Sequence, residues 1–344
     1  MLQNRSLKSL PSSAKLVLAL CFLSLLSIGC EKTDPTLGTG TAVETPGTFV
    51  TTLAGSGILG YAEGMGTAAS FGQAFGIAVN SQGVIYVTDN YNDAIRKITP
   101  DGQVSTLVSF PDPTGIALDK QGNLYVGSEG NTRIRKVSPA GVISDLPGGA
   151  ATYNFNYPRG LAVDAQGALY VTERLGYRIC KISPAGDVSV LAGSGTAGVV
   201  DGIGTAARFH SPHGIVVDAD GTVFVSEGNG NLIRKITPAG AVTTFAGSGS
   251  LNSADGIGIA AQFNTPYGLA IDAQGVLYAT SFDCIRRITR DGAVTTLAGL
   301  PNNSGYADGT NVTAQFAWAT CVAGAPSDGL YVTEPLRVRK IIVR

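Results

Sequence analysis

The chain has 344 residues, of which 44% are hydrophobic and 14% charged, so it has enough apolar material for a large core and too little charge for a disordered chain. Its 24 Lys and Arg residues nearly balance its 25 Asp and Glu residues, which excludes a global field for nucleic acid or for a cationic partner. The 46 glycines are nearly twice the ordinary share of roughly 7%, and they predict many tight turns between short strands.

The first thirty residues have the pattern of an export signal. A basic stretch precedes the apolar run LVLALCFLSLLSI, from Leu16 to Ile28, which is too short to span a bilayer comfortably. The run ends in Ser27-Ile28-Gly29-Cys30, which resembles the lipobox of bacterial lipoproteins, although Ser27 replaces the usual Leu. We therefore predict a lipoprotein signal peptide over residues 1–29 and lipidation at Cys30, which would attach the protein to a membrane. An ordinary cleaved signal is the alternative.

Residues 30–46 are predicted to be the lipidated cysteine and a flexible tether. The stretch is polar and rich in Thr, Gly and Pro, which is typical of a linker. Glu31 rather than Asp follows Cys30, and by resemblance to proteobacterial lipoproteins this favours the outer membrane. The expected location is the cell envelope, and the sequence leaves open whether the protein is periplasmic or surface-exposed.

Six copies of one unit fill residues 47–344. An aromatic residue in the second hydrophobic run marks each copy, at intervals of 39 to 54 residues: Tyr86, Tyr125, Tyr170, Phe224, Tyr278 and Tyr331. Each complete copy has four β-rich runs, separated by turn sequences such as Asp-x-x-Gly and Pro-x-Gly. Repeats of this length with four short strands predict an all-β fold, a six-bladed β-propeller of four-stranded antiparallel blades.

Two further patterns support this fold. The sixth copy lacks its fourth run, whereas Thr48 to Gly55 forms a lone run at the start that matches it. We expect this N-terminal strand to complete the last blade and close the ring without an open edge. A phenylalanine also stands five residues before each copy, and we expect all six to be buried wedges between blades: Phe71, Phe110, Phe155, Phe209, Phe263 and Phe316.

The repeat resembles the NHL repeat. The resemblance rests on Pro-x-Gly-Ile-Ala-Val-Asp, Tyr-Val-x-Asp/Glu and Ile-Arg-Lys-Ile, and it covers about residues 47–344. The chain is similar to bacterial secreted NHL-repeat proteins. The resemblance implies a propeller but no single activity, because lactonases, lyases, RNA binders and adhesion modules share this fold.

Acidic residues recur at three positions of the repeat, and all are predicted to be structural. One set begins the first hairpin of its blades and forms turns: Asp119, Asp164, Asp218 and Asp272, with Asn80 in the first blade. A second set ends the second strand and can pair with cations of the third: Asp89, Glu173, Glu227 and Glu334. The third set precedes loop glycines and is expected to hydrogen-bond the turn: Glu63, Asp201, Asp255 and Asp308. No cofactor is predicted, and calcium at these loops is the alternative.

The residues that usually carry catalysis are sparse. His210 and His213 are the only histidines, and neither a Gly-x-Ser-x-Gly motif nor a zinc spacing occurs. Cys180, Cys284 and Cys321 are interpreted as small buried residues, with a Cys284–Cys321 bridge as the alternative. No catalytic residue is therefore assigned. Nucleic acid is not an expected partner, because an exported protein meets little RNA.

The candidate site is the mouth of the central channel, where the copies differ from one another. The residues just before the inner strands are Phe75, Thr114, Arg159, His213, Tyr267 and Thr320. The residues two places earlier are Gln73, Asp112, Tyr157, Ser211, Thr265 and Trp318. Such divergence is expected of an unconstrained rim or of a specialised site. The candidate ligand-binding residues are Phe75, Asp112, Tyr157, Arg159, His213, Tyr267 and Trp318, whose side chains suit an anionic or sugar ligand.

These observations predict a ligand-binding or protein-interaction module at the cell envelope. The expected partners are an envelope protein, a glycan or a small anionic ligand, together with the membrane through the lipid on Cys30. The alternative is a metal-dependent hydrolase or lactonase that uses the channel mouth. A purely structural envelope protein, with a partner on the broad top face, is a third interpretation.

Overall fold

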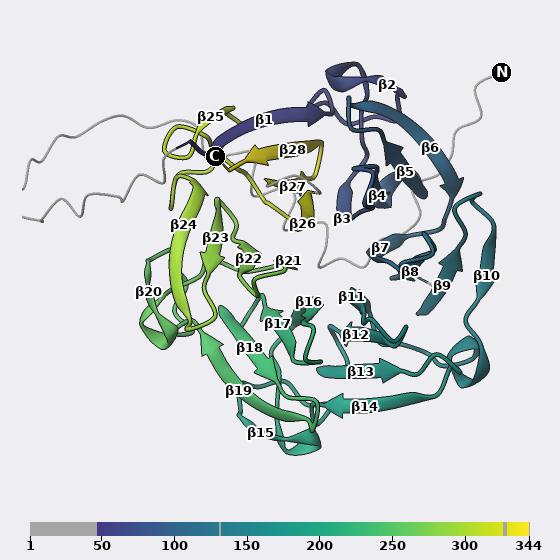
Figure 1. Cartoon of the computed structure of the whole chain (residues 1–344), viewed down its shortest axis with the longest axis vertical. Coiled ribbons are helices and arrows are strands. Elements are labelled where there is room, and N and C mark those ends of the chain that lie inside the picture. Colours follow the sequence, from purple (N-terminus) through teal and green to yellow (C-terminus); the bar gives the residue numbers. More distant parts are fainter. Residues whose placement is uncertain (1–46, 131, 326–328, 344) are drawn as a thin grey trace, which may run out of the picture. The chain divides into compact units, whose positions relative to one another are not determined.

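The computed structural model describes residues 47–130, 132–325 and 329–343. They form six antiparallel sheets arranged as blades around a central axis (Figure 1), which confirms the predicted six-bladed propeller. The predicted signal peptide, Cys30 and tether lie outside the described residues. Within the described part of the chain, no helix has the length and hydrophobicity needed to cross a membrane.

The blades follow one another along the chain, and each is built from the channel outwards. Blade 1 consists of β3 (Ala74–Val79), β4 (Ile85–Asp89), β5 (Ala94–Ile98) and β6 (Gln103–Ser109). Blade 2 consists of β7 (Pro113–Leu118), β8 (Leu124–Ser128), β9 (Arg133–Val137) and β10 (Ile143–Asp145). Blade 3 consists of β11 (Pro158–Val163), β12 (Leu169–Glu173), β13 (Arg178–Ile182) and β14 (Val188–Ala192).

The second half of the ring repeats this order. Blade 4 consists of β16 (Pro212–Val217), β17 (Val223–Glu227), β18 (Leu232–Ile236) and β19 (Ala241–Ala246). Blade 5 consists of β21 (Leu269–Ile271), β22 (Leu277–Thr280), β23 (Cys284–Ile288) and β24 (Ala293–Gly299). Blade 6 consists of β26 (Cys321–Ala325), β27 (Gly329–Glu334), β28 (Arg337–Ile342) and, as its fourth strand, β1 (Phe49–Ala54).

Four blades carry an additional outer strand of two residues, formed by the loop that leads into the blade. These strands are β2 (Gly64–Met65), β15 (Gly202–Ile203), β20 (Gly256–Ile257) and β25 (Gly309–Thr310). The first three continue into the 3-10 helices η1 (Gly66–Ala68), η4 (Gly204–Ala206) and η5 (Gly258–Ala260). Two further 3-10 helices are η2 (Asn90–Asn92) and η3 (Gly148–Ala151). The glycine-rich loops therefore form the outer edges of blades.

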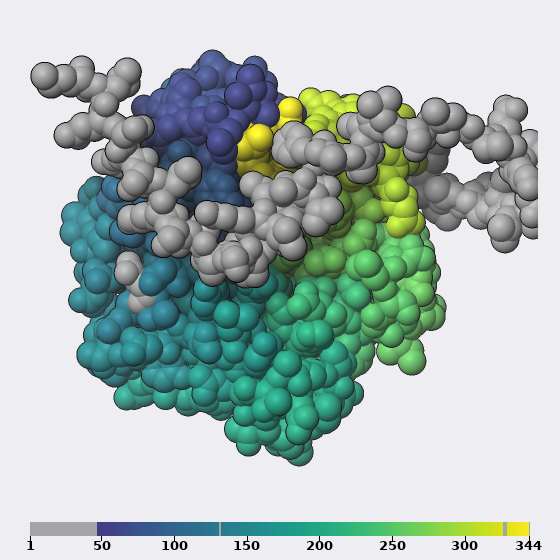
Figure 2. Space-filling model, turned by 180° about the vertical axis from the view of Figure 1, so that it is seen from behind, coloured from purple at the N-terminus to yellow at the C-terminus, as the bar shows by residue number. Residues whose placement is uncertain are grey.

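The two ends of the described chain meet in blade 6. Strand β1 pairs with β28, with Val50 opposite Ile341 and Thr52 opposite Arg339. Figure 2 shows the other face, where the yellow C-terminal segment lies against the purple N-terminal one. The prediction that the N-terminal strand completes the last blade is confirmed.

The six phenylalanines are the predicted wedges, with exposed fractions of 2% or less. In four blades a fully buried arginine, such as Arg96 or Arg339, lies with its guanidinium carbon 5.2–5.5 Å from the centre of the wedge ring. All four predicted strand-to-strand ion pairs form, including Arg96–Asp89 at 3.0 Å and Arg339–Glu334 at 2.9 Å. A buried charge is tolerated here because it is paired and hydrogen-bonded.

The loop acids differ from the expectation that they bond their own turns. The Asp308 carboxylate lies 2.7 Å from Arg339 and accepts from the Thr52 backbone N–H at 3.0 Å. Asp201 and Asp255 reach the arginines of their own blades in the same way. The reason is that a guanidinium offers a charge-assisted bond, which is stronger than a turn bond. The hairpin aspartates are turn formers as predicted: Asp119 Oδ1 accepts from the backbone of both residues 121 and 123.

The three described cysteines are free, so the alternative bridge between Cys284 and Cys321 is not formed. Cys180 and Cys284 are fully buried as predicted. Cys321 is only half-buried, contrary to the prediction, because it stands in the channel wall where the other five blades have glycine.

Candidate ligand-binding site at the channel mouth

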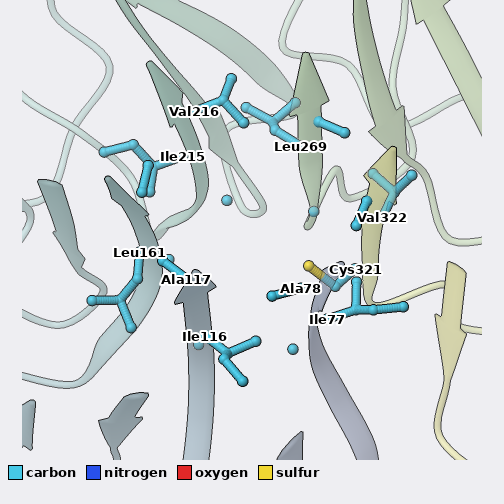
Figure 3. Close-up of a pocket in the computed structure, with 18 of the residues that line it drawn as sticks. Ile77, Ala78, Ile116, Ala117, Leu161, Ile215, Val216, Leu269, Cys321 and Val322 are labelled. Carbon is cyan, nitrogen blue, oxygen red and sulfur yellow. The ribbon is translucent and has the colours of Figure 1, made fainter. Parts of the chain in front are cut away.

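A cavity of about 290 Å³ lies at the centre of the ring, and all six inner strands line it (Figure 3). Its wall is mostly Ile, Leu, Val and Ala side chains. Among the described lining residues, those whose side chains carry nitrogen or a hydroxyl group gather where the inner strands begin: Arg159, His213, Tyr267 and Thr320. This end of the cavity is the predicted channel mouth.

Glycines bring the inner strands close together just below this mouth. A Cβ atom on Gly160 would lie 2.1 Å from the His213 carbonyl oxygen, and one on Gly214 would lie 2.3 Å from that of Tyr267. The glycine of the repeated Pro-x-Gly motif is therefore required for close approach of neighbouring backbones. This approach places the side chains at the preceding position next to one another around the mouth.

Arg159 is the principal cation of the mouth. It is the second residue of β11, and its guanidinium lies 3.0 Å from the Glu129 carboxylate and 4.6 Å from the centre of the Phe75 ring. Its side chain is only 15% exposed. Burial lowers the pKa of Arg159, while Glu129 raises it and Arg174 lowers it further. An arginine stays charged in proteins, so its positive charge is held in a poorly solvated place.

His213 lies beside this cation and is 6% exposed. Its ring packs edge-on against Tyr267, with centroids 4.4 Å apart, and its Nε2 lies 3.2 Å from Ser211 Oγ. Burial, followed by the charges of Arg159 and Arg174, holds the pKa of His213 well below 6.5. The imidazole is therefore neutral at neutral pH, and it adds a polar group to the mouth without adding charge.

Gly228 makes room for this histidine. A Cβ atom at Gly228 would lie 2.9 Å from His213 Cδ2. Gly228 follows β17 directly, and Arg174 holds the corresponding place after β12, where its Nε donates to Ser211 Oγ at 3.3 Å. The residues after the second strands thus shape the mouth together with those of the inner strands.

The mouth carries an excess of positive charge. Arg174 lies close enough to Arg159 to lower the pKa of that guanidinium, and both arginines disfavour a charge on His213. Glu129 neutralises one of them, and no ion pair to Arg174 is found within the described ranges. An anion placed here would relieve this repulsion, and in a poorly solvated mouth the gain is larger than in water.

The structure brings together four of the seven predicted residues. The cavity is lined by Phe75, Arg159, His213 and Tyr267. The sequence predicts one residue of each blade just before its inner strand, but in the first four blades this residue lies inside the strand. Thr114 and Thr320 are buried and bond backbone carbonyls of the next blade, so they close the ring.

Asp112, Tyr157 and Trp318 do not line the cavity, and neither do Glu129 and Arg174. Tyr157 nevertheless lies close enough to Arg159 to raise the pKa of that guanidinium. The backbones of Asp112, Tyr157 and Trp318 are left-handed, with φ of 45°, 57° and 59°, and Ser211 and Thr265 share this conformation. The Tyr157 carbonyl accepts from the Arg174 N–H at 3.0 Å, and that of Asp112 from the Glu129 N–H at 3.1 Å. These positions differ in side chain but share the left-handed backbone conformation. For a non-glycine residue this conformation is less stable than an ordinary one by roughly 1–2 kcal/mol.

Glu129 and Arg174 are the site residues that sequence reasoning missed. Both directly follow the second strand of their blade, where the equivalent residues are Asn90, Gly228, Phe282 and Pro335. This position also diverges between the copies. Comparing it across the repeat would have added it to the candidate site.

The mouth does not fit a metal ion. Among the residues described, no three His, Cys, Asp or Glu side chains are placed to hold one. The groups that do meet here are two guanidiniums and a single carboxylate, and a hard cation requires several oxygen ligands.

No family model matches this chain, and no curated protein matches it significantly. Among solved structures, it is similar to a protein of unknown function from Bacteroides thetaiotaomicron, with 21% identity and a TM-score of 0.73 over 87% of this chain and 76% of that one. An auxiliary nutrient binding protein from the same organism has 17% identity and a TM-score of 0.67, over 86% and 76%. A gluconolactonase from Xanthomonas campestris has 18% identity and a TM-score of 0.62, over 90% and 94%. At these identities the likeness shows the fold alone.

Proposed function

We propose that this protein is an NHL-repeat propeller that is exported, anchored to the outer membrane by a lipid on Cys30, and binds a small anionic ligand at the channel mouth. The repeat motifs support the family, and the apolar run before Cys30 supports export and lipidation. The mouth supports the ligand class. An envelope protein or a glycan carrying acidic groups is the corresponding macromolecular partner.

One observation carries the choice of an anion. The mouth holds two arginines and a neutral histidine against a single glutamate, and the Arg159 guanidinium is held in place by the Phe75 ring. An immobilised guanidinium binds a carboxylate at a smaller entropic cost than a free one. The site is therefore arranged in advance for an anionic group.

The alternative of a metal-dependent lactonase is less well supported. The similarity to a gluconolactonase concerns the fold, and a propeller of this shape serves many activities. Metal-assisted hydrolysis needs a cation held by several donors and an open coordination position. Two guanidiniums at the mouth would repel such a cation. The similarity to a nutrient binding protein is likewise a similarity of fold.

The proposal is tested by calorimetric titration of the protein with butyrate and gluconate, and with their neutral counterparts butanol and glucose. We expect at least one anion to bind and both neutral compounds to fail. Arg159→Gln and Arg174→Gln should each weaken binding by about tenfold or more, because a hydrogen bond to a charged group contributes about 1.5–3 kcal/mol.

The matched control is Arg135→Gln, which removes an arginine whose side chain is 44% exposed and pairs with Asp145 on the outer strand. This variant should bind within twofold of the parent protein. Anion affinities that are unchanged in both mouth variants would contradict the proposal.

A further inference from the structure

The cavity below the mouth is apolar in every blade. One layer of its wall is formed by a branched aliphatic residue from each inner strand, several of which Figure 3 labels: Ile77, Ile116, Leu161, Ile215, Leu269 and Val322. The next position along each strand is a small residue, alanine or valine. Arg159, His213 and Tyr267 are at one end only. The same cavity therefore has a charged entrance and a hydrocarbon interior.

This interior is large enough for a ligand, and the side chains along it are aliphatic, although the inner strands are edge strands of their sheets. An engineered cavity of about 150 Å³ with Leu, Ile and Phe walls binds benzene, and the volume here is about 290 Å³. A sugar ring placed here would find hydrogen-bond partners only on the backbone edges of the inner strands, because the Ile, Leu and Val side chains offer none. A hydrocarbon chain needs no such partners, and each methylene removed from water favours binding.

We propose that the ligand is an amphipathic carboxylate, with a single unbranched hydrocarbon chain inside the channel and its carboxylate at the mouth beside Arg159 and Arg174. This inference rests on the proposed function and specifies its ligand class. The charged entrance orients the ligand, and the hydrocarbon wall gives the affinity. A sugar acid would use the entrance alone.

The entrance is suited to exchange one carboxylate for another. Arg159 Nη2 lies 3.0 Å from the Glu129 carboxylate, and the Glu129 side chain is 29% exposed. The buried Arg159 Nε has no hydrogen-bond partner among the described residues. That nitrogen is shielded from solvent, as the same nitrogen is in the buried arginines of the blades, so a ligand carboxylate would lie between the two arginines while Glu129 turns to solvent.

The test is a calorimetric titration with butyrate, hexanoate, octanoate and decanoate, with decanol and gluconate as comparisons. Burial of a methylene contributes enough to tighten binding about fourfold, so affinity should rise by that factor per methylene until the channel is full. Decanol should bind at least tenfold more weakly than decanoate because it lacks the charge. Gluconate should bind no better than butyrate.

Two variants fill the channel from different blades, so that a folding failure in one leaves the other. Ala162→Leu and Ala323→Leu enlarge half-buried residues that line the cavity. Each should reduce decanoate affinity tenfold or more and leave butyrate affinity within twofold. The control is Ala185→Leu, the same change at an exposed turn between β13 and β14, which should alter neither.

The outcomes separate the two proposals. Anion binding that depends on Arg159 but is independent of chain length, or that favours gluconate, would overturn the amphipathic ligand and keep the anion site. Absence of binding by any of the anions would overturn both.

Discussion

His213 shows how the mouth is organised at the level of single residues. It is buried between two arginines, and it fits only because residue 228 has no side chain. Protonation would place a third positive charge in a poorly solvated site, so the ring serves as a neutral polar group next to Tyr267. The positive charge of the mouth is thus limited to the two arginines, which remain available to an anion.

The depressed pKa of His213 makes stability depend on pH. In the unfolded chain this residue takes up a proton below about pH 6.5, while in the folded state the lowered pKa keeps it neutral. The unfolded state therefore binds more protons, and this contribution to stability is lost as pH falls from about 6.5 towards the folded pKa, by at most about 1.4 kcal/mol per pH unit.

Urea unfolding of the parent protein and of His213→Gln at pH 7.5, 6.0 and 5.0 measures this effect. The parent protein should lose more stability than the variant on acidification. Arg174→Gln should reduce the difference, because it removes one of the charges that oppose protonation. Equal losses in the parent protein and in His213→Gln would show that the residue titrates alike in both states.

At the level of the blade, a recurrent unit joins the wedge phenylalanine, a buried arginine and an acid at the end of the second strand. Blades 1, 4 and 6 contain it complete. Blades 2, 3 and 5 depart from it, since Ser128 and Ser281 replace the acid in blades 2 and 5 and Cys180 occupies the arginine position in blade 3. Two of these altered blades, blades 2 and 3, supply Glu129, Arg159 and Arg174 to the mouth, whereas blade 5 supplies the uncharged Tyr267.

Loss of one member of this unit should be costly. Arg234→Met leaves the fully buried Glu227 without its cation, and removal of one partner of a buried pair typically lowers the free energy of unfolding by about 3–5 kcal/mol. Arg135→Met breaks an exposed pair, which typically contributes about 0–1 kcal/mol. Urea unfolding of both variants tests the comparison. The double variant Arg234→Met with Glu227→Met should recover part of the loss, and equal effects of the two single changes would contradict this account.

At the level of the whole molecule, the repeat made most of the fold predictable. The six wedge phenylalanines, the strand-to-strand ion pairs and the closing strand follow from comparing equivalent positions, because each blade solves the same packing problem. The site was predictable only in part. Arg159 and His213 stood out as departures from the repeat, but Glu129 and Arg174 belong to another repeated position, and only the fold shows that both positions meet at the mouth. Trp318 and Tyr157 diverge as well, yet their shared feature is the backbone conformation, which side-chain comparison does not show.

The closure of the ring by β1 gives a prediction for the entire propeller. Removal of residues 47–55 would take Val50 and Ala54, both 1% exposed or less, out of two different core clusters and would leave the edge of β28 unpaired. A chain that begins at Ser56 should therefore melt at a much lower temperature or aggregate through the open edge, because burial of Val50 alone is worth about 1.5–3 kcal/mol.

The control is a chain that begins at Gly47, which keeps β1 and should melt as the longer chain does. A synthetic peptide of residues 47–55 should restore the shortened propeller when added in trans, since it supplies the missing pairing with β28. Thermal unfolding followed by circular dichroism, together with light scattering, measures both effects. If the chain from Ser56 melts as a cooperative monomer at the temperature of the control, the six blades hold together without a closing strand, and stability resides in the blade-to-blade contacts alone.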